Sequence, residues 1–222
     1  MDTDQEQNLT ISDLLNNNRA IYQVPDDRLY SVEDLLYNYQ KFLALYLKDA
    51  AKKQAGSART NLMVALAWYL ALINRFHIDI EGNLWKRYSY KCPYCLELPC
   101  YCQKEKNIQA QKTGRPGSRK PQDISEWQKM IEKIYPNEEN DNFRHVLYSK
   151  LDLLNSAFRL FMREKKKKQF HEIELLSTDH FVALIRAFNH HNFNIESEYL
   201  KMFSGGCYVC KQIPCQCNYF EE

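Results

Sequence analysis

Four long stretches of the chain carry apolar residues at intervals of three and four, the spacing of an amphipathic α-helix. Shorter helices are predicted near residues 11 to 21 and 124 to 134, and Asp79 and Asn194 have the character of N-caps that open a last short helix in each half. The pattern predicts an all-α fold. The apolar positions of the four stretches are Leu36, Tyr39, Leu43, Tyr46 and Leu47; Leu62, Ala65, Leu66, Tyr69, Leu72, Ile73 and Phe76; Leu147, Leu151, Leu154, Phe158, Phe161 and Met162; and Phe181, Leu184, Ile185 and Phe188.

The pattern occurs twice along the chain. When the sequence is shifted by 115 residues, positions 32–102 align with positions 147–217 without a gap. With an adjustment of two residues, the segments 11–22 and 124–135 also correspond. Four cysteines and a proline recur at identical spacing, so we interpret the chain as a tandem duplication.

The duplication divides the chain into a repeat at 1–102, a basic flexible linker at 103–123 and a second repeat at 124–222. The short helices of one repeat cannot cover both of its long amphipathic helices. We therefore expect the repeats to pack on each other as an internal pseudo-dimer with a four-helix-bundle core. The sequence leaves open whether this unit stays monomeric or dimerises further.

All eight cysteines lie in two clusters with the pattern C-x2-C-x4-C-x-C. Thiolates at this spacing suit tetrahedral Zn²⁺, and each cluster holds enough ligands to close its own structural site. Two structural zinc ions are therefore predicted, while reduced thiols, disulfides and an iron–sulfur cluster stay open as alternatives. The ligands are Cys92, Cys95, Cys100 and Cys102 in the first site, and Cys207, Cys210, Cys215 and Cys217 in the second.

Composition favours a globular, soluble protein. Of 222 residues 45% are hydrophobic, and the net charge of +2 indicates no global attraction to nucleic acid or membrane. The longest strongly apolar run, Leu62 to Ile73, is about half the roughly twenty residues that cross a bilayer, and the first six residues are acidic rather than basic. We expect a cytoplasmic protein without membrane contact.

Basic side chains gather in the linker and in one run of four lysines. They are candidates for contact with the phosphates of a nucleotide or of nucleic acid, although a solvated tether and a solvated helix end have the same composition. The candidates are Lys112, Arg115, Arg119, Lys120, Lys165, Lys166, Lys167 and Lys168.

The residues of the first repeat also resemble a known family. The stretch from Leu62 to Arg75, followed by Ile78-Asp79-Ile80-Glu81, Lys86-Arg87-Tyr88 and the cysteine tail, is similar to the MazG-like branch of the all-α nucleotide pyrophosphatases. Ile124-Ser125-Glu126-Trp127-Gln128 resembles the opening helix of that family. The resemblance implies four-helix assemblies, usually dimeric, that use Mg²⁺ to hydrolyse nucleoside triphosphates to monophosphate and pyrophosphate.

The acidic pairs that this chemistry requires are largely missing. The resemblance implies Glu-x-x-Glu and Glu-x-x-Asp, whose spacing aims both carboxylates of a pair at one cluster of hard cations. Asp179 is the one carboxylate left in register, and Asp152, Glu172 and Glu174 lie near it in the sequence but out of register. The corresponding positions are Asn38 and Lys41, Asn61 and Val64, Leu153 and Ser156, and Leu176 and Asp179.

The leading functional prediction is therefore a non-catalytic MazG-like protein that binds a nucleotide or a protein partner as a scaffold or regulatory subunit. One alternative is a Mg²⁺-dependent pyrophosphohydrolase in which Asp152, Glu172, Glu174 and Asp179 converge in space on the metal. A second alternative is a nucleic-acid-binding module that uses zinc knuckles and the basic linker. No glycine-rich phosphate loop, dinucleotide fingerprint or nucleophile elbow is present in the sequence.

Overall fold

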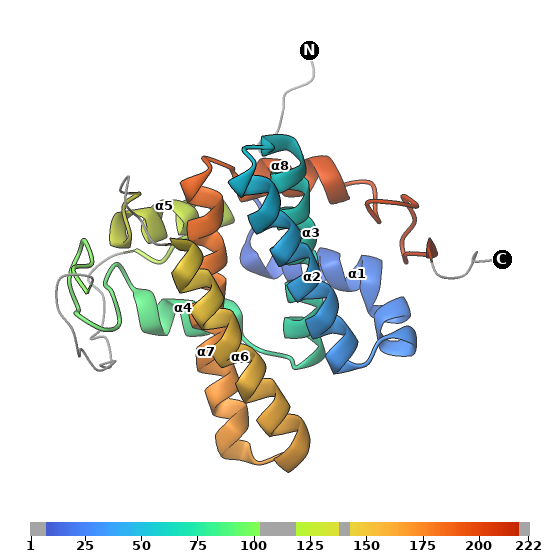
Figure 1. Ribbon diagram of the computed structural model, residues 1–222, viewed down its shortest axis with the longest axis horizontal. Coiled ribbons are helices and arrows are strands. Elements are labelled where there is room, and N and C mark those ends of the chain that lie inside the picture. The colour runs from blue at the N-terminus through green and yellow to red at the C-terminus, as the bar shows by residue number, and fades with distance from the viewer. Residues whose placement is uncertain (1–7, 103–118, 138–142, 218–222) are drawn as a thin grey trace.

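The computed structural model describes residues 8–102, 119–137 and 143–217. Over these residues the chain forms eight α-helices and no β-strand, which confirms the predicted all-α class (Figure 1). The helices are α1 (Ile11–Leu29), α2 (Val32–Ala51), α3 (Ala55–Arg75), α4 (Ile80–Tyr88), α5 (Ile124–Ile134), α6 (Phe143–Glu164), α7 (Lys167–His190) and α8 (Ile195–Phe203).

The two short final helices begin at the predicted N-caps. The Asp79 side chain accepts a hydrogen bond from the Gly82 backbone N–H at 2.9 Å, and Asn194 accepts one from Ser197 at 2.8 Å. Such caps satisfy N–H groups that have no partner within the helix. Local sequence alone is therefore enough to start α4 and α8.

Helix α1 is longer than its apolar pattern suggested. The prediction ended near residue 21, whereas the helix continues through Pro25 to Leu29. Proline in a helix interior removes one hydrogen bond and is unfavourable, so tertiary contacts must support the last turns. Arg75 supplies one of them, because its guanidinium donates to the backbone oxygen of Asp26 at 2.8 Å.

Two helical hairpins, α2–α3 and α6–α7, form the centre of the molecule, and α3 contacts α7 between them. Helix α1 packs on α3 and helix α5 packs on α7, each within its own half. The final helices cross over: α4 contacts α7, and α8 contacts α3. The two halves are therefore joined by the ends of each half as well as by their centres (Figure 1).

An aromatic cluster fills the contact between the hairpins. Tyr39 from α2 hydrogen-bonds His180 from α7, and both side chains are fully buried. Tyr69 from α3 stacks on Phe181 with ring centroids 6.0 Å apart, and its hydroxyl donates to the Ser177 backbone oxygen at 2.7 Å. Buried hydroxyls need such partners, so this cluster sets the register of α3 against α7.

Polar contacts in one half recur in the other. Asn74 Nδ2 donates to the Leu15 backbone oxygen at 3.0 Å, and Asn189, its counterpart 115 residues later, donates to the Gln128 oxygen at the same distance. These pairs tie α1 to α3 and α5 to α7 in the same way.

Among the described residues, no single helix has both the length and the apolar character needed to cross a membrane; α3 and α4 reach that threshold only together and are bent by 100° where they join.

Candidate metal centres and buried acidic site

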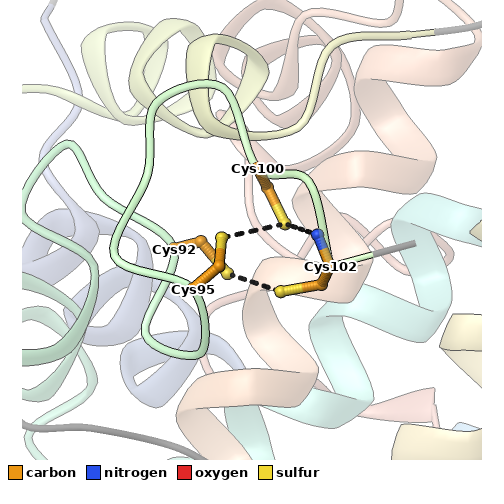
Figure 2. A group of neighbouring side chains, drawn as sticks. All are labelled: Cys92, Cys95, Cys100 and Cys102. Carbon is orange, nitrogen blue, oxygen red and sulfur yellow. Dashed lines mark hydrogen bonds between the residues drawn. The ribbon is translucent and has the colours of Figure 1, made fainter. Parts of the chain in front are cut away.

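The first cysteine cluster follows α4 and brings four sulfur atoms together. The side chains point toward one another (Figure 2), and all four Sγ atoms lie within 4.8 Å of each other. The Cys92 and Cys102 sulfurs are 3.5 Å apart, and those of Cys95 and Cys100 are 3.9 Å apart. Four sulfurs at the Zn–S bond length of about 2.3 Å in a tetrahedron lie about 3.8 Å apart. The arrangement therefore has the dimensions of a tetrathiolate metal site.

The second cluster follows α8 and has the same geometry. Cys207 and Cys217 have sulfurs 3.7 Å apart, and Cys210 and Cys215 have sulfurs 3.9 Å apart. All four are free thiols at these distances, as in the first cluster. Within each cluster the four sulfurs lie close enough to one another to hold a metal ion, as the spacing predicted.

The same backbone turn builds both clusters. Leu96 and Lys211 occupy corresponding positions and both have φ near +60°, at +63° and +57°. In each turn the backbone N–H of this residue donates to the backbone oxygen of the first cysteine in the cluster. Leu96 donates to Cys92 and Lys211 donates to Cys207, each at 2.9 Å. The first and second ligands are thereby brought to one point.

Each cluster is anchored on the opposite half of the chain. The Cys100 amide donates to the Ile134 backbone oxygen, at the end of α5, at 2.8 Å. The Cys215 amide donates to the Ile21 oxygen, within α1, at 2.6 Å. The clusters consequently lie far apart, one beside α5 and the other near the C-terminal end (Figure 1).

The surroundings of the first cluster favour the deprotonated form of Cys92. A hydrogen bond with Cys100, helped by one from Tyr135, lowers the pKa of Cys92 to about 4, although burial opposes this shift. At neutral pH this cluster therefore carries a thiolate before any metal arrives. Metal ligation requires deprotonated sulfur, and a bound cation displaces the remaining protons.

We expect the purified chain to contain two zinc ions, one per cluster. Elemental analysis by mass spectrometry measures this ratio directly, and a thiol-reactive reagent should release both ions stoichiometrically. A preparation that binds no thiophilic metal after zinc loading, or that contains iron and inorganic sulfide instead, contradicts the prediction.

Asp179, the acid left in register, lies in α7 at the contact with α4 and is 3% exposed. Arg87 donates to both carboxylate oxygens, with Nε 2.5 Å from Oδ1 and Nη2 3.0 Å from Oδ2. The Tyr88 and Tyr94 hydroxyls donate at 2.7 and 2.8 Å, and Lys150 Nζ lies 3.2 Å from Oδ2. The carboxylate thus accepts five hydrogen bonds from its own chain.

Electrostatics keep Asp179 ionised in this position. Burial raises its pKa, but the hydrogen bonds from Arg87 and the charge of Lys150 outweigh burial and lower the pKa below the usual value. The same carboxylate raises the pKa of Lys150 against the effect of its own burial. Asp179 is thus the one negative charge in a cluster with two positive charges, Arg87 and Lys150, and its lone pairs are already occupied.

The structure does not bring the other candidate acids to Asp179. Asp152 and Glu172 are exposed, and Glu174 is half-buried beside His171, with Oε2 3.4 Å from Nδ1. Within the described part of the chain, the two cysteine clusters are the only groups of three or more candidate ligands that converge.

The basic candidates take part in surface contacts. Lys120 pairs with Glu81 at 2.6 Å, and Arg119 lies 3.7 Å from Glu126. The lysine run Lys165 to Lys168 is exposed at the turn between α6 and α7. Lys112 and Arg115 lie outside the described residues.

A cavity adjoins each cysteine cluster. The smaller, of about 220 Å³, includes Asp179 and Lys150 in its lining. The larger, of about 440 Å³, lies among α1, α2, α3 and the second cluster, and includes Asn61 and Val64. These two residues stand at one of the acidic pairs that the family resemblance implies, so the larger cavity occupies that position without its carboxylates.

Sequence reasoning missed the partners of Asp179 and also missed Asp26. Arg87 and Tyr88 belong to the stretch that carries the resemblance, but nothing in their spacing indicates a partner in α7. Asp26 lies in α1 next to a proline and is 6% exposed. The only feature of the sequence that could have indicated a buried Asp26 is its position on the apolar face of a helix.

Asp26 should make stability depend on pH. Burial raises its pKa to about 7, although Arg75 opposes the shift. Because the folded state holds this proton more tightly than the unfolded state, the contribution of Asp26 to stability should decrease as the pH rises from about 4 to 7. Asp26→Asn should remove this decrease and stabilise the fold at pH 8 by about 2 to 4 kcal/mol relative to its effect at pH 4. Urea unfolding at both pH values tests this, and an equal effect at both contradicts it.

No protein-family profile, no curated protein and no solved structure matches the chain.

Proposed function

We propose that the protein is a non-catalytic binding protein, derived from a MazG-like pyrophosphatase, in which two structural zinc ions clamp a duplicated helical framework. One observation carries the loss of catalysis: Asp179 accepts hydrogen bonds from Arg87, Tyr88, Tyr94 and Lys150 and has no lone pair left for Mg²⁺. A hard cation needs several oxygen ligands, and one engaged carboxylate does not supply them.

The crossed contacts of the cysteine clusters support a pseudo-dimeric arrangement. Each cluster bonds to the backbone of the opposite half, at Ile134 and Ile21, as two subunits of a dimer would exchange their tails. On this proposal zinc stiffens each tail so that it holds the two halves together. Structural zinc sites in peptides contribute about 10 kcal/mol of apparent binding free energy, enough to order a short loop.

The larger cavity supports binding of a partner other than a nucleoside triphosphate. A triphosphate needs basic side chains or bound metal ions, and no lysine or arginine belongs to the described lining of this cavity. Its lining is mainly apolar, with Val64 and Trp68 from α3 among its members. The proposed function is thus retention of the framework for binding, after loss of the hydrolytic site.

A pyrophosphate-release assay tests this proposal. The zinc-loaded chain is incubated with Mg²⁺ and a panel of ribonucleoside and deoxyribonucleoside triphosphates, beside an Asp179→Asn variant. We expect neither protein to release pyrophosphate above the rate without protein. Turnover by the natural chain that the substitution abolishes overturns the proposal and favours a rearranged acidic site.

A further inference from the structure

The two cavities occupy corresponding places in the two halves. Tyr22 of the larger cavity corresponds to Tyr135 of the smaller, and Cys207 corresponds to Cys92. The larger cavity lies between the second cysteine cluster, α1 and α3, and the smaller lies between the first cysteine cluster, the C-cap of α5 and α7. Because the two halves correspond residue by residue, the lining of one cavity can be compared directly with the lining of the other.

In the smaller cavity, charged side chains of the chain form part of the lining. Asp179 and Tyr94 form part of the ion cluster there. Their counterparts 115 residues away, Val64 and Val209, line the larger cavity. The larger cavity has about 440 Å³, against about 220 Å³ for the smaller. At these two positions the larger cavity therefore has shorter, apolar side chains.

The larger cavity has the size and lining of a small-molecule site. Such sites have volumes of about 300 to 1,000 Å³ and combine apolar walls with few polar groups. A water molecule takes about 30 Å³ of the liquid, so the space suits an organic molecule rather than a single ion. Six aromatic side chains contribute to its walls: Tyr22, Tyr30, Phe42, Trp68, Phe203 and Tyr208.

Asp26 supplies the one acidic side chain in the described lining of this cavity. It is 94% buried, at 6% exposure, and its carboxylate accepts no hydrogen bond from the described part of the chain. Arg75 donates to the backbone oxygen of Asp26 and pairs with the Asp27 carboxylate at 2.8 Å, so its charge acts on the Asp26 carboxylate without a hydrogen bond to it. A buried carboxylate without a hydrogen-bond donor is costly and favours a positively charged ligand.

The rings add a second attraction for positive charge. The faces of Tyr and Trp rings attract organic cations, most strongly where water is excluded. Tyr30 and Trp68 meet edge to face, with centroids 5.3 Å apart, and both line the cavity. We propose that this cavity binds an organic cation with an apolar body, whose nitrogen pairs with Asp26 and whose hydrocarbon part packs on the aromatic walls. The inference rests on the proposed binding function and names its ligand class.

Calorimetric titration of the full, zinc-loaded chain tests the proposal with three probes of similar size. Benzyltrimethylammonium carries the charge, neopentylbenzene is its neutral isostere, and phenylacetate is the anion. We expect the cation to bind at least tenfold more tightly than the isostere, and the anion to give no measurable binding. Absence of cation binding, or equal affinity for cation and isostere, overturns the proposal.

Two variants locate the binding. Asp26→Asn keeps the shape of the side chain and should reduce the preference for the cation over the isostere at least severalfold, leaving only the part that the aromatic rings supply. Ala67→Phe should fill the cavity and abolish binding of both, while the matched Val182→Phe, at the corresponding position of the smaller cavity, should leave both affinities unchanged. Circular dichroism establishes that each variant is folded. An undiminished preference for the cation in folded Asp26→Asn overturns the proposal.

The outcomes separate the two proposals. Failure of the probes to bind, without pyrophosphate release, removes the cation site and leaves the non-catalytic binding protein in place. Pyrophosphate release overturns the proposed function whatever the probes do.

Discussion

Replacing Cys95 and Cys100 together by serine is expected to reduce the zinc content from two ions per chain to one. Loss of half of the ligands removes the site, and the loop that carries them then loses the metal that orders it. We expect the unfolding midpoint to fall by about 10 °C or more, because a loss of about 3 kcal/mol or more corresponds to that shift in a chain of this size. Elemental analysis and thermal unfolding measure the two effects.

Because each cysteine cluster hydrogen-bonds the backbone of the opposite half, loss of one zinc ion should loosen a specific helix. The first cluster is bonded to Ile134 at the end of α5, so loss of the first zinc should increase amide hydrogen exchange in α5, in the other half. The matched variant with serine at Cys210 and Cys215 should instead increase exchange in α1 around Ile21. Increased exchange confined to the half that carries the substitution would contradict this account of the clusters as clamps.

Replacing Asp179 by alanine is expected to destabilise the fold by about 3 to 5 kcal/mol, because it leaves Arg87 and Lys150 as buried charges without their carboxylate. Their side chains are 17% and 20% exposed, so water compensates only in part. Urea unfolding at pH 7 measures the loss. A change of less than 1 kcal/mol would contradict the view that this ion cluster joins α4 and α6 to α7.

The duplication supplies a control for this prediction. At the positions that correspond to Asp179, Arg87 and Lys150, the other half carries Val64, Met202 and Leu35. The triple variant Asp179→Val, Arg87→Met, Lys150→Leu should recover most of the stability that the single change loses, since apolar replacement of a whole ion cluster is often neutral or stabilising. If the triple variant is less stable than Asp179→Ala, the two sites are not interchangeable in packing.

Acid should act on this cluster in a defined direction. The folded-state pKa of Asp179 is below its usual value, so its contribution to stability is present above about pH 4 and is lost as the pH falls through the folded pKa. The stability difference between the natural chain and Asp179→Ala should therefore be constant from pH 5 to 7 and decrease below pH 4. Unfolding at pH 3 and pH 7 measures this difference.

The two halves differ at the corresponding positions Asp179 and Val64, and the two cavities that these residues line differ as well. Around Asp179 the carboxylate is paired with Arg87 and Lys150 of the same chain, and the smaller cavity has Asp179 and Lys150 in its lining. In the other half the corresponding residue is the apolar Val64. It lines the larger cavity, in which Asp26 is the acidic side chain of the described lining. A duplicated protein can give up one site to stability and keep the other for a ligand, and the proposed cation site follows from this difference.

The sequence by itself determined the helices and the two groups of cysteines that could hold a metal ion. Helical periodicity and caps such as Asp79 and Asn194 depend on residues within a few positions of each other, and the structure contains the helices they predict. Each cysteine cluster spans eleven residues, so one local turn is enough to bring its sulfurs within reach of a metal. The same local reasoning ended α1 too early, near residue 21, because the support that Arg75 gives to the last turns comes from another helix.

Only the tertiary structure decided which helices the cysteine clusters contact and which side chains surround Asp179. Cys100 meets Ile134, and Arg87 meets Asp179, at separations of tens of residues along the chain that no local pattern encodes. The open space beside Asp26 also results from packing, since its size depends on which side chains of four helices and the second cysteine cluster face one another. Secondary structure and metal ligation follow short-range spacing, whereas burial of charge and the volume of a cavity follow from the contacts of the folded chain.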